Sequence, residues 1–444
     1  MKVLLVSANR ERFPEPVFPI GPAYTASALQ REGWSVRMFD AGMARSPGPS
    51  LRREIESFRP EFVGVSLRNV DNAAYPHTRC YLPGYVRIVA EIRASTQAPL
   101  LLGGSGFSLF PGELMELLRA EGGATGDGED GLLRLLRGEG GPILHGGLPD
   151  LSSVGFPGNL DEIFPSFRRY GTIGVQTARG CPRECAYCTY PSLEGSGMRL
   201  RPPEAVAAEM ERLFRRYGRR EFFLVDSTFN ADESHMAAVC RAIRSAGIPA
   251  RFSCYLQPVS SDPGLYRLLA EAGCVAVDFG TDTGSERMLA SLRKGFTVDD
   301  IRAASGACRK AGIDFCHSLL FGGPGETEET IRETVRRMDE SCPKAVVAMA
   351  GIRIYPGTEI ERIARQEGRI ADGDSLLAPR FYLPPGDPDR ILRAVREAAA
   401  GRSNWFLPGR RDWSAAIAPR LLRLIPRAGP LWRNFRRPAR CRGP

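Results

Sequence analysis

Short apolar runs alternate with amphipathic stretches along the first 140 residues. Runs such as Lys2–Ser7 and Phe62–Leu67 are largely apolar, as expected for parallel strands that are buried on both faces. Stretches with apolar residues at helical spacing separate these runs, at residues 22–32, 50–58, 83–94 and 112–119. Repeated strand–helix units of this length predict an open, doubly wound parallel sheet. Residues 1–140 are therefore expected to form one α/β domain.

A second strand–helix alternation begins near residue 171. Its six predicted strands are residues 172–177, 222–225, 251–256, 275–279, 315–320 and 346–354. Six βα units predict a partial (β/α)6 TIM-type barrel, with its chemistry at the carboxyl ends of the strands. The expected domains are thus 1–140, a Gly- and Pro-rich linker at 141–170, the barrel at 171–372 and a C-terminal extension at 373–444.

The strongest chemical signal is a cysteine loop directly after the first barrel strand. Cys181, Cys185 and Cys188 are separated by three and then two residues, with Tyr187 before the last of them. Thiolates crowded into one short loop suit soft iron. A structural zinc site normally has a fourth ligand, yet the next histidine and cysteine are His235 and Cys240. The loop therefore predicts a 4Fe–4S cluster with one iron left open.

The Cys-x3-Cys-x2-Cys spacing with Tyr187 resembles the radical S-adenosylmethionine superfamily. In that family the open iron binds S-adenosylmethionine, and one-electron reduction cleaves it to a 5′-deoxyadenosyl radical. The resemblance implies that Cys181, Cys185 and Cys188 bind the cluster, and that the protein orients the cofactor and excludes water. It extends over residues 3–370.

Turns at the ends of later barrel strands resemble the family's binding site for S-adenosylmethionine. The resemblance implies contacts from the Tyr187 backbone and from the turn that contains Gly280, Thr281 and Glu286. A Gly-x-Pro-Gly-Glu turn, which ends at Glu326, follows the fifth strand.

Two further positions belong to the same predicted site. Tyr355 follows the sixth strand, where the family backbone pairs with adenine. Asp226 ends the second strand, where it either hydrogen-bonds a ribose or amine or caps the next helix. On the third strand, alternation places Ser253, Tyr255 and Gln257 on one face, as candidates for the barrel lumen.

The first domain resembles the cobalamin-binding domain that precedes many radical S-adenosylmethionine enzymes. Ser66 and Leu67 follow its third strand, Gly103 and Gly104 its fourth, and Gly126 lies in a later turn. Ligands of such sheets lie over the carboxyl ends of the strands, and glycines let the backbone approach a large flat ligand. The resemblance implies that these five residues bind cobalamin.

One family signature is missing from this domain. The family's Asp-x-His-x-x-Gly motif provides a histidine below the cobalt, whereas here Asp40 is followed by Ala41, Gly42 and Met43. His77 is the only histidine in residues 1–140 and lacks that spacing. Two readings remain open: cobalamin held without a protein histidine, or a vestigial fold without the cofactor.

The excess positive charge is confined to the end of the chain. The net charge is +9, and residues 410–444 contain ten Arg and one Asp, so the remainder is neutral. The body of the protein therefore gives no charge-based evidence for nucleic acid. The tail mixes Arg with Trp405, Trp413 and Trp432. This composition is typical of a segment lying on an anionic membrane, although an RNA-facing arm, a docking arm for a partner and a disordered end are alternatives.

The sequence favours a cobalamin-dependent radical S-adenosylmethionine enzyme, a C-methyltransferase that acts on an unactivated carbon of a lipid or secondary metabolite. One alternative is a non-methylating cyclisation or rearrangement; another is a cluster-based redox sensor or nucleic-acid-binding factor. The expected partners are a small-molecule or lipid substrate and an electron donor such as flavodoxin or ferredoxin. Scattered cysteines and the absence of an apolar run near 18 residues predict a cytoplasmic protein, with possible contact of the tail to the inner face of the membrane.

Overall fold

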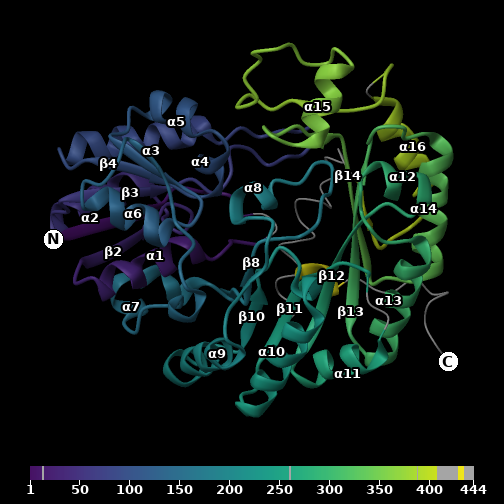
Figure 1. Ribbon diagram of the computed structural model, residues 1–444, viewed down its shortest axis with the longest axis horizontal. Coiled ribbons are helices and arrows are strands. Elements are labelled where there is room, and N and C mark those ends of the chain that lie inside the picture. Colours follow the sequence, from purple (N-terminus) through teal and green to yellow (C-terminus); the bar gives the residue numbers. More distant parts are fainter. Residues whose placement is uncertain (13–14, 260–261, 388, 408–428, 435–444) are drawn as a thin grey trace. The chain divides into compact units, whose positions relative to one another are not determined.

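The protein consists of two compact units (Figure 1). The computed structural model describes residues 1–12, 15–259, 262–387, 389–407 and 429–434. The first unit contains Met1–Asn72 and Arg79–Gly174, and the second contains Ala73–Thr78 and Val175–Pro444. The segment 141–170, which the sequence predicts as a linker, therefore lies within the first unit.

A six-stranded parallel sheet in the order β2-β1-β3-β4-β5-β6 forms the centre of the first unit. The strands are β1 (Lys2–Ser7), β2 (Ser35–Asp40), β3 (Phe62–Ser66), β4 (Leu100–Gly103), β5 (Gly122–Thr125) and β6 (Ile143–His145). Parallel pairing brings their carboxyl ends to one edge of the sheet. The doubly wound sheet expected from the sequence is confirmed, with β5 and β6 added to it.

Helices connect these strands at the stretches where continuous apolar runs give way to apolar residues at helical spacing. They are α1 (Ile20–Arg31), α2 (Pro47–Phe58), α3 (Leu82–Ser95), α4 (Ser105–Leu109), α5 (Pro111–Leu118) and α6 (Gly128–Leu136). Proline at the first helical position starts α2 and α5, where its missing N–H has no helical partner to lose.

Residues 151–170 pack as part of the first unit's core. The segment contains α7 (Leu160–Ile163) and the short helices η1 (Leu151–Ser153) and η2 (Pro165–Arg169). Its aromatic rings surround Phe18 with ring-centre distances of 5.3–6.2 Å, from Phe156, Phe164, Phe167 and Tyr170. Prolines and glycines interrupt this segment, so its apolar residues have no regular spacing. The pattern of the sequence therefore does not predict this packing.

A seven-stranded sheet in the order β17-β14-β13-β12-β11-β10-β7 forms the second unit. All six predicted barrel strands are present and β17 is added at the edge, which confirms the α/β barrel class. The strands are β7 (Ile173–Val175), β10 (Glu221–Leu224), β11 (Arg251–Leu256), β12 (Cys274–Asp282), β13 (Asp314–Phe321), β14 (Ala345–Ala350) and β17 (Trp405–Phe406).

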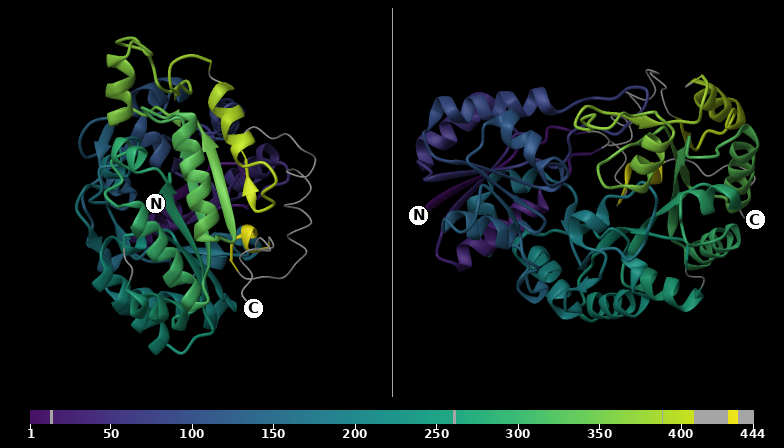
Figure 2. Two further views of the ribbon diagram at one scale, coloured as in Figure 1. Left: turned by 90° about the vertical axis from the view of Figure 1, so that its right-hand side faces the viewer. Right: turned by 45° about the horizontal axis from the view of Figure 1, so that its top comes forward.

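Helices lie along the outer face of this sheet (Figures 1 and 2). They are α9 (Pro203–Tyr217), α10 (Glu233–Ser245), α11 (Pro263–Glu271), α12 (Glu286–Ser291), α13 (Val298–Ala311) and α14 (Glu328–Ser341). Capping boxes at Thr297 and Thr327 start α13 and α14, so both helices begin where the sequence places an N-cap residue.

The two faces of the seven-stranded sheet have different surroundings. His317 of β13 is buried toward α13: Thr281 Oγ1 lies 2.7 Å from its Nδ1, and Ser305 Oγ of α13 lies 3.1 Å from its Nε2. Burial lowers the pKa of His317 to about 3, so the ring is neutral. Residues of the alternate register, such as Asp278 and Gly280, lie on the opposite face, here called the inner face. The predicted lumen residue Tyr255 is aligned with Asp278 on this face.

Two of the three tail tryptophans lie against the barrel. Trp405 belongs to β17, which pairs with β14. Trp432, in η4 (Leu431–Asn434), is 8% exposed and packs against Ala276, Cys316 and Ala345. Its indole N–H donates to Asp278 Oδ2 at 3.3 Å. Trp413 and the rest of 408–428 and 435–444 lie outside the described residues. The expected membrane segment gains no support from Trp405 or Trp432, because both serve as packing residues.

Replacing Trp432 by alanine is expected to expose Cys316 to alkylating reagents, because the indole covers this thiol at 0% exposure. A loss of unfolding free energy of about 3 kcal/mol should accompany it. Mass spectrometry after iodoacetamide treatment measures the labelling. Cys308, buried in α13, is the internal control and should stay unlabelled. Labelling of Cys316 in the unchanged protein would contradict this packing.

In the described part of the chain, no helix is both long and apolar enough to cross a membrane.

Candidate active site

The cysteine loop begins at the carboxyl end of the first barrel strand and is held by backbone hydrogen bonds. β8 (Ala178–Arg179) leads into it and pairs with β9 (Arg199–Leu200). The N–H of Cys181 donates to Gly195 O at 3.1 Å, and the N–H of Ala186 donates to Leu292 O at 3.0 Å. The carbonyl of Ala186 accepts from Ile360 N at 2.8 Å. Segments distant in sequence thus fix both halves of the loop.

Gly180 is required at the entrance of the loop. Its φ of +91° is left-handed, and a Cβ added there would lie far inside van der Waals contact of the Gly197 carbonyl. Its N–H donates to Glu194 Oε2 at 3.1 Å, and its carbonyl accepts from Ser227 Oγ at 3.0 Å. Only glycine can adopt this left-handed φ and also leave room for the nearby Gly197 carbonyl.

Asp226 holds the end of the first barrel strand from inside the protein. Its Oδ1 accepts from the N–H groups of Thr177 at 2.7 Å and Ala178 at 3.1 Å, and its Oδ2 accepts from the Thr177 hydroxyl. The next helix is capped by Asp232 instead. The N-cap alternative for Asp226 is therefore wrong, whereas its predicted contact with a ligand stays a prediction. We assign it to positioning the strand that leads into the cysteine loop.

The three thiols of the loop lie within electrostatic reach of one another. All three are free. Burial raises the pKa of the Cys185 thiol, and it raises that of Cys188 to about 11, with smaller contributions from the neighbouring thiols. Thiolates at such a site need positive charge, which iron supplies.

The three thiols share one loop, and the kind of metal group they could bind depends on their arrangement. Among the residues that the structure describes, no three His, Cys, Asp or Glu side chains converge as ligands of one ion. A 4Fe–4S cluster needs a different arrangement, because each thiolate binds its own iron. The spacing of three sulfurs along one fixed loop fits that requirement.

A buried polar group lies beside the thiols and was not predicted from the sequence. Tyr187 donates its hydroxyl to Asp282 Oδ2, and Lys294 Nζ lies 2.6 Å from the same oxygen and 3.4 Å from the Tyr187 hydroxyl. Burial, together with the charge of Asp282, raises the pKa of Tyr187 well above its usual range. The predicted role of Tyr187 rested on its backbone, whereas the structure gives its side chain a structural partner.

The turn after β12 separates the predicted site residues into different environments. Gly280 lies on the inner face, and an added Cβ would meet nothing within 4 Å, so a ligand can approach it closely. The Thr281 side chain instead lies on the helix-covered side, at His317. Glu286 is exposed and accepts from Val298 N at 2.7 Å, so it holds the connection between α12 and α13.

Two buried polar atoms at these strand ends have no hydrogen-bond partner among the residues that the structure describes. Ser285 Oγ follows β12, and Gln257 Oε1 follows β11. Both side chains are largely buried, where an unpaired polar atom is costly. Such atoms at the carboxyl ends of barrel strands fit a polar ligand, as S-adenosylmethionine would be. Gln257 is one of the lumen candidates predicted from the sequence, and Ser285 adds a second polar group.

The Gly-x-Pro-Gly-Glu turn after β13 closes on its own glutamate. Glu326 is buried, accepts from Gly322 N at 3.3 Å, and accepts from the Thr330 hydroxyl. Tyr355 lies after β15 (Ile352–Arg353), with the Arg353 guanidinium 4.6 Å from its ring centre. Its carbonyl accepts from Thr358 Oγ1 at 2.7 Å, which orients the turn before α15 (Glu359–Gln366).

Replacing Glu326 by glutamine is expected to flatten the pH dependence of stability. Burial raises the pKa of Glu326 to about 7 from 4.5, so the folded state favours the protonated form. In the wild type, the free energy of unfolding should therefore fall by about 3 kcal/mol between pH 4.5 and 7 and stay level at higher pH. In Glu326→Gln this fall should be absent. Urea unfolding at pH 5 and pH 8 measures the difference. Exposed Glu328 is the control, because Glu328→Gln should keep the wild-type slope; a Glu326→Gln variant with that same slope would refute the assignment.

In the first unit, the predicted cobalamin residues meet at the carboxyl edge of the sheet. Leu67 N donates to Gly103 O at 2.8 Å, and Gly104 has a left-handed φ of +93°, where a Cβ would lie 2.8 Å from Leu67 O. Ser66 and Gly126 end β3 and follow β5 at the same edge. The Leu67 side chain is buried in the core, so only its backbone is placed for a ligand. Glycine is thus required at Gly104 by the close approach of Leu67 O, at the edge where ligands of such sheets lie.

Asp40, where the missing histidine motif would begin, has an internal structural role. Asp40 accepts from Gly42 N at 2.7 Å and from the Tyr170 hydroxyl, so its carboxylate serves the internal packing. Asn9 Nδ2, after β1, is buried and has no hydrogen-bond partner in the described part of the chain. His145 ends β6 with its Nδ1 3.2 Å from Thr125 Oγ1, whereas His77 belongs to the second unit. Asn9 is thus a polar candidate that the sequence analysis did not single out.

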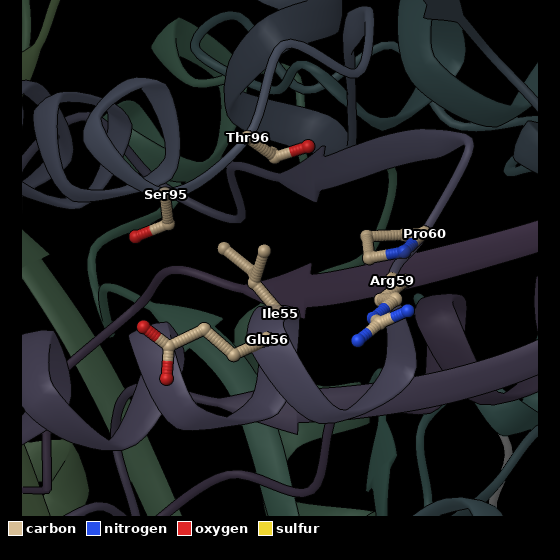
Figure 3. A pocket seen from close by; sticks show the side chains of 6 residues that line it. All are labelled: Ile55, Glu56, Arg59, Pro60, Ser95 and Thr96. Atoms are coloured by element: carbon tan, nitrogen blue, oxygen red, sulfur yellow. The ribbon is translucent and has the colours of Figure 1, made fainter.

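A hollow between α2 and α3 lies elsewhere in the first unit (Figure 3). Its lining residues include Glu56, Arg59, Pro60 and Ser95. Pro60 precedes β3 and Ser95 precedes β4, so the hollow is at the amino end of the strands. It is therefore separate from the edge that carries the predicted ligand residues.

Comparison with known families identifies both units. Residues 175–338 match the family model of the radical SAM superfamily, and residues 6–136 match that of the B12 binding domain. The chain therefore contains a radical S-adenosylmethionine domain preceded by a cobalamin-binding domain, and it is an enzyme of the radical S-adenosylmethionine class. The cofactors that these domains imply are a 4Fe–4S cluster, S-adenosylmethionine and cobalamin.

Individual relatives match more than three quarters of this chain. The tryptophan 2-C-methyltransferase of Streptomyces laurentii is 26% identical over 434 residues, which cover 78% of this chain and 72% of that protein. The cytidylyl-2-hydroxyethylphosphonate methyltransferase of Streptomyces wedmorensis is 23% identical, with 93% and 92% covered. The structure of the radical S-adenosylmethionine methyltransferase TsrM from Kitasatospora setae, bound to tryptophan and an S-adenosylmethionine analogue, is 25% identical with a TM-score of 0.83, and 97% of each chain is covered.

Proposed function

We propose that this protein is a cobalamin-dependent methyltransferase that transfers a methyl group from S-adenosylmethionine to a carbon atom of a small molecule. The observation that carries the proposal is the match to TsrM over 97% of both chains, together with the matches of this chain to both family models. A cluster-based sensor would not need a cobalamin-binding domain. It would also not need turns after the later barrel strands that can accommodate S-adenosylmethionine, such as the one that contains Gly280.

The cofactors would be held by residues of both units. The cluster would be bound by Cys181, Cys185 and Cys188. S-adenosylmethionine would lie against Gly280, where no side chain blocks its approach, and would pair with the Ser285 hydroxyl. The edge formed by Ser66, Leu67, Gly103, Gly104 and Gly126 would bind cobalamin. When bound, these groups supply reductive cleavage of S-adenosylmethionine and carriage of its methyl group. The protein's own part is to fix the thiols, present unpaired polar atoms and exclude water.

The inner face favours an apolar or aromatic methyl acceptor. Tyr255 and Met349 are each 43% exposed, and the register places both on the inner face of the sheet. The Phe223 ring packs edge-on against Tyr255 at 5.0 Å, which fixes the orientation of the exposed ring. Exposed aromatic and thioether groups on a concave sheet suit an aromatic ligand. We therefore extend the proposal to an aromatic small molecule, consistent with the tryptophan of two relatives.

The test is anaerobic incubation of the reconstituted protein with methyl-deuterated S-adenosylmethionine and a set of acceptors. The set contains tryptophan, an indole without the amino acid group, and an aliphatic alcohol as a non-aromatic control. Mass spectrometry should find a gain of one labelled methyl group in an aromatic acceptor only. Tyr255→Ala should weaken turnover of that acceptor, whereas Arg396→Ala, on α16 (Asp389–Ala398), should not.

The by-product separates the possible reactions. Methylation accompanied by 5′-deoxyadenosine indicates that a hydrogen atom is abstracted from an unactivated carbon. Methylation without it indicates attack by a nucleophilic aromatic carbon. Formation of 5′-deoxyadenosine without any methylated product would contradict the proposal and favour a cyclisation or rearrangement.

A further inference from the structure

The short helix η4 covers the amino end of the inner face of the seven-stranded sheet. Trp432 of this helix is 8% exposed and packs against Ala276, Cys316 and Ala345. These three residues lie at or near the first residues of β12, β13 and β14. The indole therefore forms a floor at this end of the sheet, and a ligand on the inner face lies between this floor and the carboxyl ends of the strands.

An ion pair next to Trp432 holds the floor in place. Arg433 Nε donates to Asp314 Oδ2 at 3.1 Å, and the two side chains are 17% and 18% exposed. Asp314 is the first residue of β13, so the pair ties η4 to the amino end of the sheet. Because water reaches this pair poorly, salt screens it little. The guanidinium nearest to the floor is thus already neutralised by an acid of the sheet.

Asp278 is a second acid at the floor, and its printed partner is neutral. Its Oδ2 accepts from the indole N–H of Trp432 at 3.3 Å. Its neighbours in register are Tyr255 and Cys316, which are ordinarily uncharged at pH 7. Within the described ranges, no lysine or arginine forms an ion pair with Asp278. Asp278 is half-buried, and a carboxylate partly removed from water is costly without a counter-cation.

The charge of this carboxyl group at neutral pH follows from its surroundings. Burial raises the pKa of Asp278 to about 6 from 3.8, and the hydrogen bond from Trp432 opposes the shift. The group is therefore still largely ionised at pH 7. A protonated amine that approached it would supply the missing positive charge and a charge-assisted hydrogen bond.

The position of Asp278 matches the length of a small aromatic amine. Tyr255, which is 43% exposed, is aligned with Asp278 on the neighbouring strand, about 4.8 Å away in the backbone. Gly280, where we place S-adenosylmethionine, lies two residues further along β12, a rise of about 7 Å. An aromatic ring with a short aminoalkyl side chain has a comparable length. Such a molecule, lying against Tyr255, can reach the reacting groups with one end and Asp278 with the other.

We propose that Asp278 is a specificity-determining residue that binds a protonated amino group of the methyl acceptor above the floor formed by Trp432. The acceptor is then an aromatic amine or amino acid whose ring lies against Tyr255. The Trp432 N–H orients the carboxylate, which can still accept from an ammonium group because a carboxylate has about four acceptor positions. This inference rests on the proposed function and names the class of its acceptor. It assigns no chemical step to Asp278.

The test is isothermal titration calorimetry of the reconstituted full chain with two probes of equal size. Tryptamine carries the ammonium group, and 3-propylindole has a methyl group in its place. Wild type should bind tryptamine about tenfold more tightly than 3-propylindole. Asp278→Asn should bind tryptamine about tenfold more weakly than wild type does and should bind 3-propylindole unchanged. Asp299→Asn, exposed on α13, is the control and should match wild type for both probes.

A second readout separates ligand binding from anchoring of the floor. The asparagine amide oxygen can still accept from the Trp432 N–H, so Cys316 should stay unlabelled by iodoacetamide in Asp278→Asn. Labelled Cys316 together with weaker binding of both probes would mean that Asp278 only anchors Trp432, and the inference would be refuted. If Asp278→Asn does not fold, Asp278→Glu decides. Its carboxylate extends one methylene further, so its preference should shift from tryptamine to the shorter 3-(aminomethyl)indole; an unchanged preference would refute the inference.

The outcomes keep this inference apart from the proposed function. Equal binding of the two probes by wild type, or no binding of either, would overturn the inference even if a labelled methyl group is transferred to another aromatic acceptor. Binding of tryptamine that depends on Asp278 would support it. If no acceptor, tryptamine included, then gains a methyl group, the proposed methyl transfer alone would be overturned.

Discussion

Replacing Cys185 by serine is expected to abolish the brown absorbance of the cluster and to reduce methyl transfer to background. Cys185 is the central thiol of the loop, between Cys181 and Cys188. A serine oxygen is a poor ligand for iron that prefers sulfur. Iron analysis, the visible spectrum and product formation measure the loss in the anaerobically reconstituted protein.

A matched control separates loss of a ligand from loss of a thiol. Cys80 is free and exposed, so Cys80→Ser should retain the wild-type iron content and activity. Cys181→Ser and Cys188→Ser should behave as Cys185→Ser does. Retention of the full iron content in any of these three variants would show that the remaining sulfurs suffice, and the ligand assignment would be wrong.

Replacing Gly180 by alanine is expected to unfold the entrance of the cysteine loop. Gly180 and Gly195 have nearly the same φ, +91° and +93°. A Cβ at Gly195 would meet nothing within 4 Å, whereas one at Gly180 would collide with the Gly197 carbonyl. Backbone strain of about 1–3 kcal/mol should therefore affect both variants, and a steric term of similar size should be added only at Gly180.

Urea unfolding and cluster content test this difference together. Gly195→Ala should fold and bind iron with moderately reduced stability. Gly180→Ala should lose a further amount of unfolding free energy, about 1–3 kcal/mol for the steric cost. It should also bind little iron, because Cys181 follows Gly180 directly. Equal stability of the two variants would mean that the loop relaxes around the new methyl group, and the tight packing at Gly180 would be disproved.

The fold was largely predictable because its elements repeat local patterns. Buried strands such as Lys2–Ser7 and capped helices such as α13 carry their own signals. The segment 151–170 and η4 do not, since aromatic packing around Phe18 and the docking of Trp432 are contacts between distant residues. Periodicity reports only on neighbours along the chain, so both were assigned to linker or tail.

The candidate site was predictable where a motif has fixed spacing, and less so where partners are distant. The cysteines share one loop, which the sequence displays directly. Asp226 was correctly placed at a strand end, but its three bonds to Thr177 and Ala178 depend on pairing across 48 or 49 residues. Lys294 lies in the connection between α12 and α13, where a lysine is ordinarily exposed, so the sequence did not indicate its burial. Its burial could have been suspected only from the nearby Asp282, with which it pairs in space.

The central claim is that one chain binds an iron–sulfur cluster and cobalamin and uses them to move a methyl group from S-adenosylmethionine. The most direct measurement is on the full chain, purified anaerobically and reconstituted with iron, sulfide and hydroxocobalamin, with Cys185→Ser alongside. The account predicts about four irons per chain, stoichiometric cobalamin, and labelled methyl transfer that the variant lacks. A protein that retains neither iron nor cobalamin after gel filtration, or a Cys185→Ser variant as active as wild type, would contradict it.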